Sequence, residues 1–163
     1  MNSLFKITLA FALLICSSVF AFAQKPGTKK YKCMVQMTNY VGEEAYIVVS
    51  LINPKGAYEK TIYMMATDKE WYKDLEEWHK FQKKKPVNIS AITGASVAGG
   101  DRAIKVFEIE DSKIDKGYTL RFEVAVEDKE YHVKDLEVPL TKANVSGKID
   151  GKGYIRYVRM SPN

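Results

Sequence analysis

Hydrophobic and polar residues alternate along most of the chain with a period of two, which is typical of β-strands that bury one face. The alternation is clearest in residues 118–126, where Leu120 and Phe122 predict a buried face, while Arg121 and Glu123 predict a face in water. Further short segments of this kind cover residues 31–38, 45–52, 58–65, 102–110, 130–138, 145–149 and 154–160. Turn residues separate these segments at short intervals. We therefore expect a mainly β fold, an immunoglobulin-like β-sandwich of seven or eight strands.

One inserted α-helix is expected between the third and fourth strands, because the pattern changes there to a helical period. Thr67 and Glu70 match a capping box, and Trp71, Leu75 and Trp78 follow at helical spacing. The aromatic stripe has two interpretations: packing against a sheet, which we favour, or a wall for a planar ligand. Trp78 can serve both if one edge of its ring reaches the neighbouring loop.

The N-terminal segment has the pattern of a secretory signal peptide. A positively charged start and a long apolar run precede a small-residue cleavage motif that ends at Ala23. We expect residues 1–23 to be removed, residues 24–30 to form a flexible leader, and residues 31–160 to fold as a single β-sandwich domain. The protein is therefore expected to be exported to the periplasm or the extracellular space. No transmembrane segment is expected in the mature chain.

Composition and charge argue against several functions. The formal net charge of +5 falls by one when Lys6 is removed, and the charges are interspersed, so no nucleic-acid partner is expected. The two histidines, His79 and His132, and the one cysteine of the mature chain, Cys33, form no transition-metal motif. Alternation around Cys33 favours a thiol buried in a strand, with intermolecular pairing or metal binding as the alternative. Ser-His-Asp, phosphate-loop and paired-carboxylate motifs are missing too, so a stand-alone enzyme is not indicated.

The most specific stretch is the small-residue segment 90–100, which reads Ser-Ala-Ile-Thr-Gly-Ala-Ser-Val-Ala-Gly-Gly. The hydroxyls of Thr93 and Ser96 flank Gly94 and Ala95, and such small neighbours leave hydroxyl groups accessible. The segment lacks the second glycine of a nucleophile elbow and the lysine of a phosphate loop. It is therefore the candidate site that remains after the other chemistries are excluded.

This segment resembles the attachment motif of proteins that carry covalent flavin mononucleotide (FMN), in which an aspartate and two further residues precede Ser/Thr-Gly-Ala-Thr/Ser. In such proteins a flavin transferase uses flavin adenine dinucleotide (FAD) to join the flavin phosphate to the last hydroxyl. The resemblance implies that the hydroxyl of Ser96 accepts the flavin phosphate and that Thr93 provides a companion hydroxyl. Gly94 and Ala95 are the two small residues between them. Ser90 stands where the motif has aspartate.

Residues 45–138 also resemble a family of secreted bacterial proteins, domain of unknown function 2271. The resemblance rests on Leu75 and Trp78 in a Leu-x-x-Trp helix, on the Thr-Gly-Ala-Ser loop with a following glycine, and on a Gly-x-Tyr…Glu…Glu region that includes Glu123 and Glu127. It implies an immunoglobulin-like strand series and an association with exported flavin and iron-uptake redox systems.

Two functional hypotheses follow. The first is an exported, periplasmic flavin-associated or redox-accessory protein with FMN joined through a phosphoester to Ser96. Its cofactor site would comprise Thr93, Gly94, Ala95, Ser96 and Trp78, and its partners would be a flavin transferase and a membrane redox partner. The alternative is a non-enzymatic binding or interaction module of a cell-envelope system such as iron uptake. In a third reading, residues 90–100 are only a structural turn.

Overall fold

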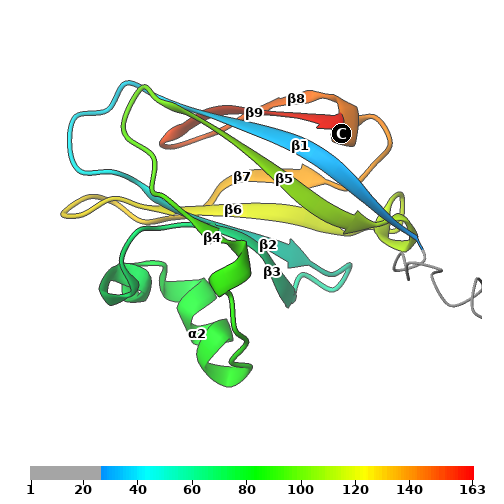
Figure 1. The fold of residues 1–163 in the computed structure, drawn as a ribbon, viewed down its shortest axis with the longest axis horizontal. Coiled ribbons are helices and arrows are strands. Elements are labelled where there is room, and N and C mark those ends of the chain that lie inside the picture. Colours follow the sequence, from blue (N-terminus) through cyan, green and yellow to red (C-terminus); the bar gives the residue numbers. More distant parts are fainter. Residues whose placement is uncertain (1–26) are drawn as a thin grey trace, which may run out of the picture.

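Two β-sheets pack face to face in the computed structural model, which describes residues 27–163 (Figure 1). The first sheet has the order β5 (Arg102–Glu110), β1 (Thr28–Met37), β9 (Ile155–Pro162), β8 (Lys148–Asp150). The second has the order β4 (Thr93–Gly94), β3 (Tyr58–Met65), β2 (Tyr46–Ile52), β6 (Thr119–Ala125), β7 (His132–Pro139). Neighbouring strands are antiparallel except β3 and β4, which are parallel. The expected mainly β sandwich is confirmed.

The expected signal peptide and the first residues of the expected leader lie outside the described residues. Strand β1 begins at Thr28, three residues before the strand start expected from the alternation. Residues 28–30 therefore belong to the first sheet rather than to a flexible leader, because Thr28 to Lys30 pair with the end of β5.

The main core fills the space between the sheets with side chains from alternate strand positions. Val35, Ile47, Phe107 and Phe122 are among its members, each with at most 1% of its surface exposed. Cys33 lies in the same core as a free thiol, and burial raises its pKa far above the ordinary range. The expectation of a buried strand thiol is confirmed.

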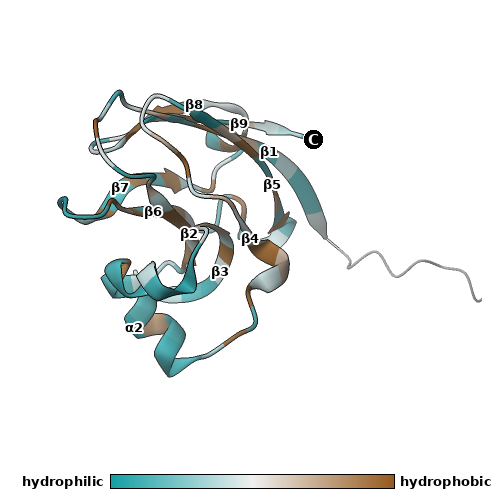
Figure 2. Cartoon of the chain, turned by 60° about the vertical axis from the view of Figure 1, so that its left-hand side comes forward, coloured by the Kyte–Doolittle hydropathy of each residue, from teal (hydrophilic) through white to brown (hydrophobic). Residues whose placement is uncertain are grey.

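A helical layer covers the outer face of the five-stranded sheet, with its hydrophilic side toward solvent (Figure 2). It consists of the 3₁₀ helix η1 (Lys69–Asp74) and the α-helix α2 (Glu76–Lys84). Leu75 and Trp78 pack there with Val48, Met64 and Ala125 of the sheet. The helical aromatic stripe is therefore a packing surface, as the favoured interpretation predicted. Three further short 3₁₀ helices occur in the described chain: η2 (Ser90–Ile92), η3 (Asp111–Lys113) and η4 (Asn144–Ser146).

This helical layer overturns one sequence prediction, that the face of β6 with Arg121 and Glu123 is exposed to water. Arg121 is only 8% exposed and Glu123 is 0% exposed. Strand β6 lies between β2 and β7 and is covered on both faces, so its alternating polar positions are buried too.

The start of the helical layer also differs from the expected capping box. Asp68, not Thr67, is the N-cap residue, and its carboxylate accepts the N–H of Glu70 at 2.9 Å. The first turns are 3₁₀ rather than α-helical, and the α-helix begins only after Leu75. Thr67 is thereby free to make a contact of its own, with Ser96.

Candidate functional site

The small-residue segment 90–100 is anchored to the fold at several points rather than forming a free loop. It opens with η2 and then forms β4, where Thr93 and Gly94 lie opposite Met64 and Met65 of β3. Further along, an antiparallel bridge joins Val97 to the residue before β2, with N–H to O distances of 2.8 and 3.1 Å. The expected loop is therefore held in place at the edge of the five-stranded sheet.

The hydroxyl of Ser96 is the centre of a small polar cluster. Its Oγ atom lies 2.7 Å from Oγ1 of Thr67 and donates a hydrogen bond to the carboxylate of Glu44. Ser96 is half-buried, while Glu44 and Thr67 are exposed. Thr67 follows β3 and Glu44 precedes β2, so two chain segments distant in sequence hold the hydroxyl at the protein surface.

The other motif residues have different environments. Thr93 Oγ1 donates to the carbonyl oxygen of Ile89 at 2.8 Å, which ties β4 to the turn before it. A Cβ atom at Gly94 would lie 2.8 Å from Tyr63 Oη and 3.3 Å from Lys105 Nζ, so this position leaves little room for a side chain. Ala95 is exposed. Lys105 thus brings a positive charge close to Gly94, two residues before Ser96.

Ser90 holds the position at which the flavin-attachment motif has aspartate. It is exposed at the start of η2, and its N–H donates to Oδ1 of Asn88 at 3.0 Å. The carboxylate that contacts the hydroxyl of Ser96 comes instead from Glu44. The structure thus places an acid beside Ser96, from a different part of the chain.

Trp78, the aromatic residue expected near this site, lies in the helical core. None of its surface is exposed, and its Nε1 atom donates to Oγ1 of Thr61 at 2.9 Å. Tyr72 meets its ring edge-on at a centroid distance of 5.6 Å. Trp78 therefore fixes the helical layer to β3, and no exposed ring face is available beside Ser96.

A second polar cluster lies beneath the start of α2, around the buried carboxylate of Glu123. One oxygen accepts from Tyr58 Oη at 2.6 Å, and the other accepts from Tyr131 Oη at 2.5 Å and from the N–H of Trp78 at 3.2 Å. Burial raises the pKa of Glu123, and the hydrogen bonds oppose this increase only in part. Burial and the neighbouring carboxylate also raise the pKa of both tyrosines. The carboxylate is fully buried while both tyrosines are half-buried, and its bond from the N–H of Trp78 ties the helix to the sheet.

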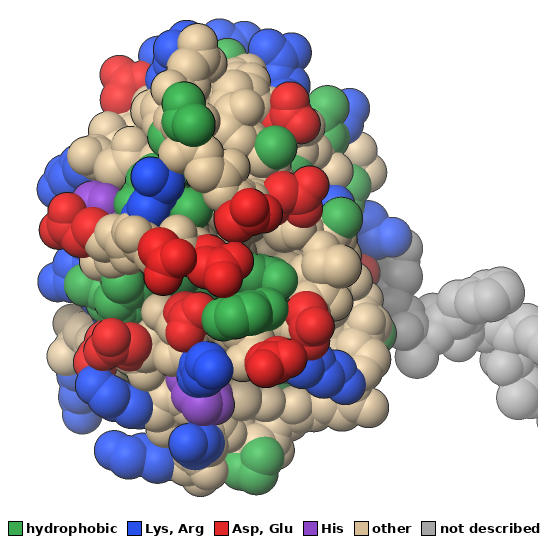
Figure 3. Space-filling view, turned by 90° about the vertical axis from the view of Figure 1, so that its left-hand side faces the viewer, with side chains coloured by type: hydrophobic (Ala, Val, Ile, Leu, Met, Phe, Trp, Pro, Cys, Tyr) green, Lys and Arg blue, Asp and Glu red, His purple; other side chains and the backbone are tan. Residues whose placement is uncertain are grey.

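Acidic side chains gather at the end of the molecule where the loops after β1 and β6 lie (Figure 3). Burial raises the pKa of Tyr46, and the carboxylates of Asp68, Glu44 and Glu127 add to this shift. In residues 27–163, no three histidine, cysteine or acidic side chains come together as ligands for a metal ion. The acidic end therefore gives the surroundings of Ser96 a negative potential without forming a metal site.

Sequence reasoning missed the residues that touch the motif, namely Glu44, Thr67, Tyr63 and Lys105. Glu44 sits in a polar stretch that reads only as a loop. Thr67 reads as a helix cap, and Lys105 as one position of an alternating strand. Each contact joins segments that are far apart in sequence, so local periodicity carries no signal for it.

Comparison with known proteins gives one match. The family model described as "Predicted periplasmic protein (DUF2271)" matches residues 28–157, which is most of the chain. No curated protein and no solved structure matches. Within residues 27–163, none of the helices has the length and apolar character required to cross a bilayer.

Proposed function

Because the chain belongs to the family described as predicted periplasmic protein (DUF2271), we propose that it is an exported carrier of FMN, joined through a phosphoester to Ser96. The observation that carries this proposal is the hydrogen bond from the half-buried Ser96 hydroxyl to the carboxylate of Glu44. The family match supports the periplasmic setting, and the motif supports the choice of cofactor.

The attachment needs a hydroxyl that can reach phosphorus and a group that can take its proton. In the proposed step the Ser96 oxygen forms a bond to the flavin-side phosphorus of FAD supplied by a transferase. The bond between the two phosphates breaks and adenosine monophosphate leaves. Glu44 accepts the hydroxyl proton along the existing hydrogen bond. Thr67 keeps the hydroxyl in position from the other side.

The residues around Ser96 fit such a phosphoester. Ala95 is small and exposed, so a transferase can approach the backbone on this side. The ammonium group of Lys105 lies close to Gly94, two residues before Ser96, and its positive charge would attract a phosphate held on this segment. A bound flavin would supply one- and two-electron transfer, which no side chain of this site provides.

The direct test is the intact mass of the mature protein after co-production with a flavin transferase. Wild type should gain the mass of one FMN group and turn yellow, and Ser96→Ala should gain nothing. Thr93→Val should still be modified, because the Thr93 hydroxyl is bonded to Ile89 and not to Ser96. An unmodified wild-type protein, beside an established acceptor that is modified in the same cells, would contradict the proposal.

The role of Glu44 is testable in the same assay. Glu44→Gln keeps the shape of the side chain but removes the proton acceptor, so the initial rate of attachment should fall by about tenfold or more. Glu43→Gln is the matched control, since Glu43 is also exposed and lies next in sequence. Equal rates for both variants would show that Glu44 does not act on the hydroxyl.

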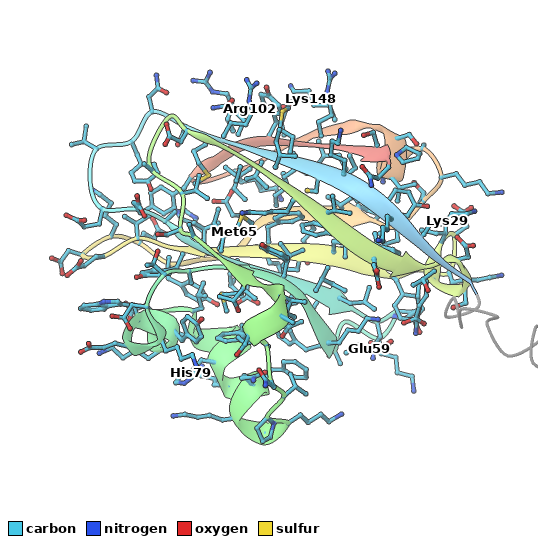
Figure 4. All side chains as sticks on the ribbon, in the orientation of Figure 1. Lys29, Glu59, Met65, His79, Arg102 and Lys148 are labelled. Atoms are coloured by element: carbon cyan, nitrogen blue, oxygen red, sulfur yellow. The ribbon has the colours of Figure 1, made fainter. Side chains whose placement is uncertain are left out.

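A second candidate function, an interaction module, is favoured by the outer face of the four-stranded sheet. No described helix covers this face, and Ile104 and Val106 of the edge strand β5 are 56% and 44% exposed. Figure 4 shows Arg102 and Lys148 pointing away from the sandwich on the same side. A photo-crosslinking residue at Ile104 should then capture an envelope partner in cells. The same probe at Val41, which is 90% exposed in a loop, should not.

A further inference from the structure

A pocket of about 520 Å³ lies between α2 and the segment 86–90. Its size falls within the range of small-molecule sites in proteins. Its lining is rich in aromatic and apolar groups, including Tyr72, Trp78, His79, Val87 and Ile89. Figure 4 shows His79 on the helical layer, away from the interior of the sandwich. None of these residues takes part in the polar cluster around Ser96.

Two features of the pocket indicate a ligand rather than solvent. Oε1 of Gln82 is buried and has no hydrogen-bond partner, while Nε2 of the same side chain donates to the carbonyl oxygen of Val87 at 2.7 Å. A buried acceptor is ordinarily satisfied, so this oxygen needs a donor. Val87 lines the pocket and is 54% exposed, and few large apolar side chains in residues 27–163 are as exposed as this. A planar molecule with an N–H group on its edge would cover the valine and satisfy the glutamine.

The pocket lies within reach of Ser96. Lys69 lines it and is two residues from Thr67, whose hydroxyl lies 2.7 Å from that of Ser96. Two residues span at most about 7 Å, so the rim residue Lys69 lies on the same short segment as the residue that contacts Ser96. The ribityl phosphate arm of FMN has an extended length of about 10 Å from ordinary bond lengths, which is longer than this two-residue span.

The charge and protonation of the rim also suit a flavin. Burial and the nearby Lys83 lower the pKa of His79, which favours the neutral imidazole and thus an uncharged aromatic surface. Lys69 and Lys83 bring positive charge to the pocket, and this charge favours the anionic form of a reduced flavin.

We propose that this pocket binds the isoalloxazine ring of the flavin, with the Gln82 side chain turning so that its Oε1 accepts the ring N3–H, and with Val87 covering one side of the ring. The identity of the ligand rests on the proposed function. Binding of the ring itself is a separate property, because it needs neither Ser96 nor a transferase.

The test uses the unmodified mature protein and riboflavin, which has the same ring but no phosphate. Wild type should quench riboflavin fluorescence saturably, because the ring lies beside the half-buried Tyr72. Val87→Glu places a charge against the ring and should weaken binding by about tenfold or more. Ile104→Glu is the matched control, since Ile104 is 56% exposed on the other sheet, and it should bind as wild type does. N3-methylriboflavin, which lacks the donor for Gln82, should also bind about tenfold more weakly.

The inference is overturned by a wild-type protein without saturable quenching, or by Val87→Glu binding riboflavin as tightly as Ile104→Glu. Ser96→Ala separates this result from the attachment hypothesis, because it should bind riboflavin like wild type. Covalent attachment without riboflavin binding would contradict the ring-binding role of the pocket and support the proposed attachment to Ser96. Riboflavin binding without attachment would support the pocket and contradict the attachment.

Discussion

The buried carboxylate of Glu123 provides the sharpest test of how the helical layer is held. In Glu123→Ala, the hydroxyls of Tyr58 and Tyr131 and the N–H of Trp78 all lose their acceptor. A buried donor without an acceptor costs about 1–3 kcal/mol. Partial entry of water offsets some of this, so we expect a loss of about 3–5 kcal/mol in the free energy of unfolding.

Glu123→Gln should behave differently. The raised pKa of Glu123 shows that burial penalises its charged form more than the hydrogen bonds favour it. A neutral side chain of the same shape keeps one oxygen as an acceptor for Tyr131 and Trp78, and the Tyr58 hydroxyl can turn to accept from the amide. The expected loss is therefore about 1 kcal/mol or less.

Urea denaturation followed by tryptophan fluorescence measures both variants, because the chain has two tryptophans and both lie in the helical layer. With a slope of about 1–3 kcal/mol per molar urea, the midpoint of Glu123→Ala should fall by roughly 2 M. Glu108→Ala, which removes an exposed carboxylate from β5, should stay within about 0.5 kcal/mol of wild type. An alanine variant within about 1 kcal/mol of wild type, or a glutamine variant as unstable as the alanine variant, would refute the reasoning.

The same carboxylate predicts a pH dependence with a definite sign. Burial raises the folded-state pKa of Glu123 above its ordinary value of 4.5, so the folded protein binds this proton more tightly than the unfolded chain does. The contribution to stability is fully present below that ordinary pKa and is lost as the pH rises through the raised one. Wild type should therefore gain stability relative to Glu123→Gln on acidification from neutral pH. A constant difference between the two proteins would contradict the shift.

Three further predictions concern other positions in the fold. Asp135 is fully buried, and its carboxylate accepts hydrogen bonds from backbone N–H groups of residues 152–155, the shortest from Tyr154 at 2.7 Å. Asp135→Asn should therefore lower the free energy of unfolding by about 2–4 kcal/mol, which thermal denaturation measures. Gly94→Ala should cost about 1 kcal/mol, and adding Tyr63→Phe should recover part of it, because the added Cβ meets the Tyr63 hydroxyl first. Cys33, with a pKa raised by burial, should react with a thiol reagent only after unfolding, and a native rate equal to the unfolded rate would contradict its placement.

Local patterns were sufficient to predict the sandwich and its inserted helix. The two-residue period placed the main strands, and the helical spacing of Leu75 and Trp78 identified the face that packs on the sheet. The alternation around Cys33 likewise predicted its burial. These features follow from side-chain direction along one segment, so a single segment contains the information.

The same patterns failed where the helical layer buries strand positions that would otherwise face water. Glu123 occupies a polar position of a strand and reads as exposed, but the helical layer covers it and two tyrosines satisfy it. The contact between Glu44 and Ser96 joins residues 52 positions apart in the chain. Periodicity cannot reveal such a contact, because the fold as a whole brings the two residues together.

The central claim is that the Ser96 hydroxyl is the acceptor of a flavin phosphate. The most direct measurement is a tandem mass spectrum of the peptide that carries residues 90–100, taken from mature protein co-produced with a flavin transferase. We predict that the FMN mass lies on Ser96, that it is absent in Ser96→Ala, and that Thr93 remains unmodified in both. FMN on Thr93, or an unmodified peptide beside an established acceptor that is fully labelled, would contradict the claim.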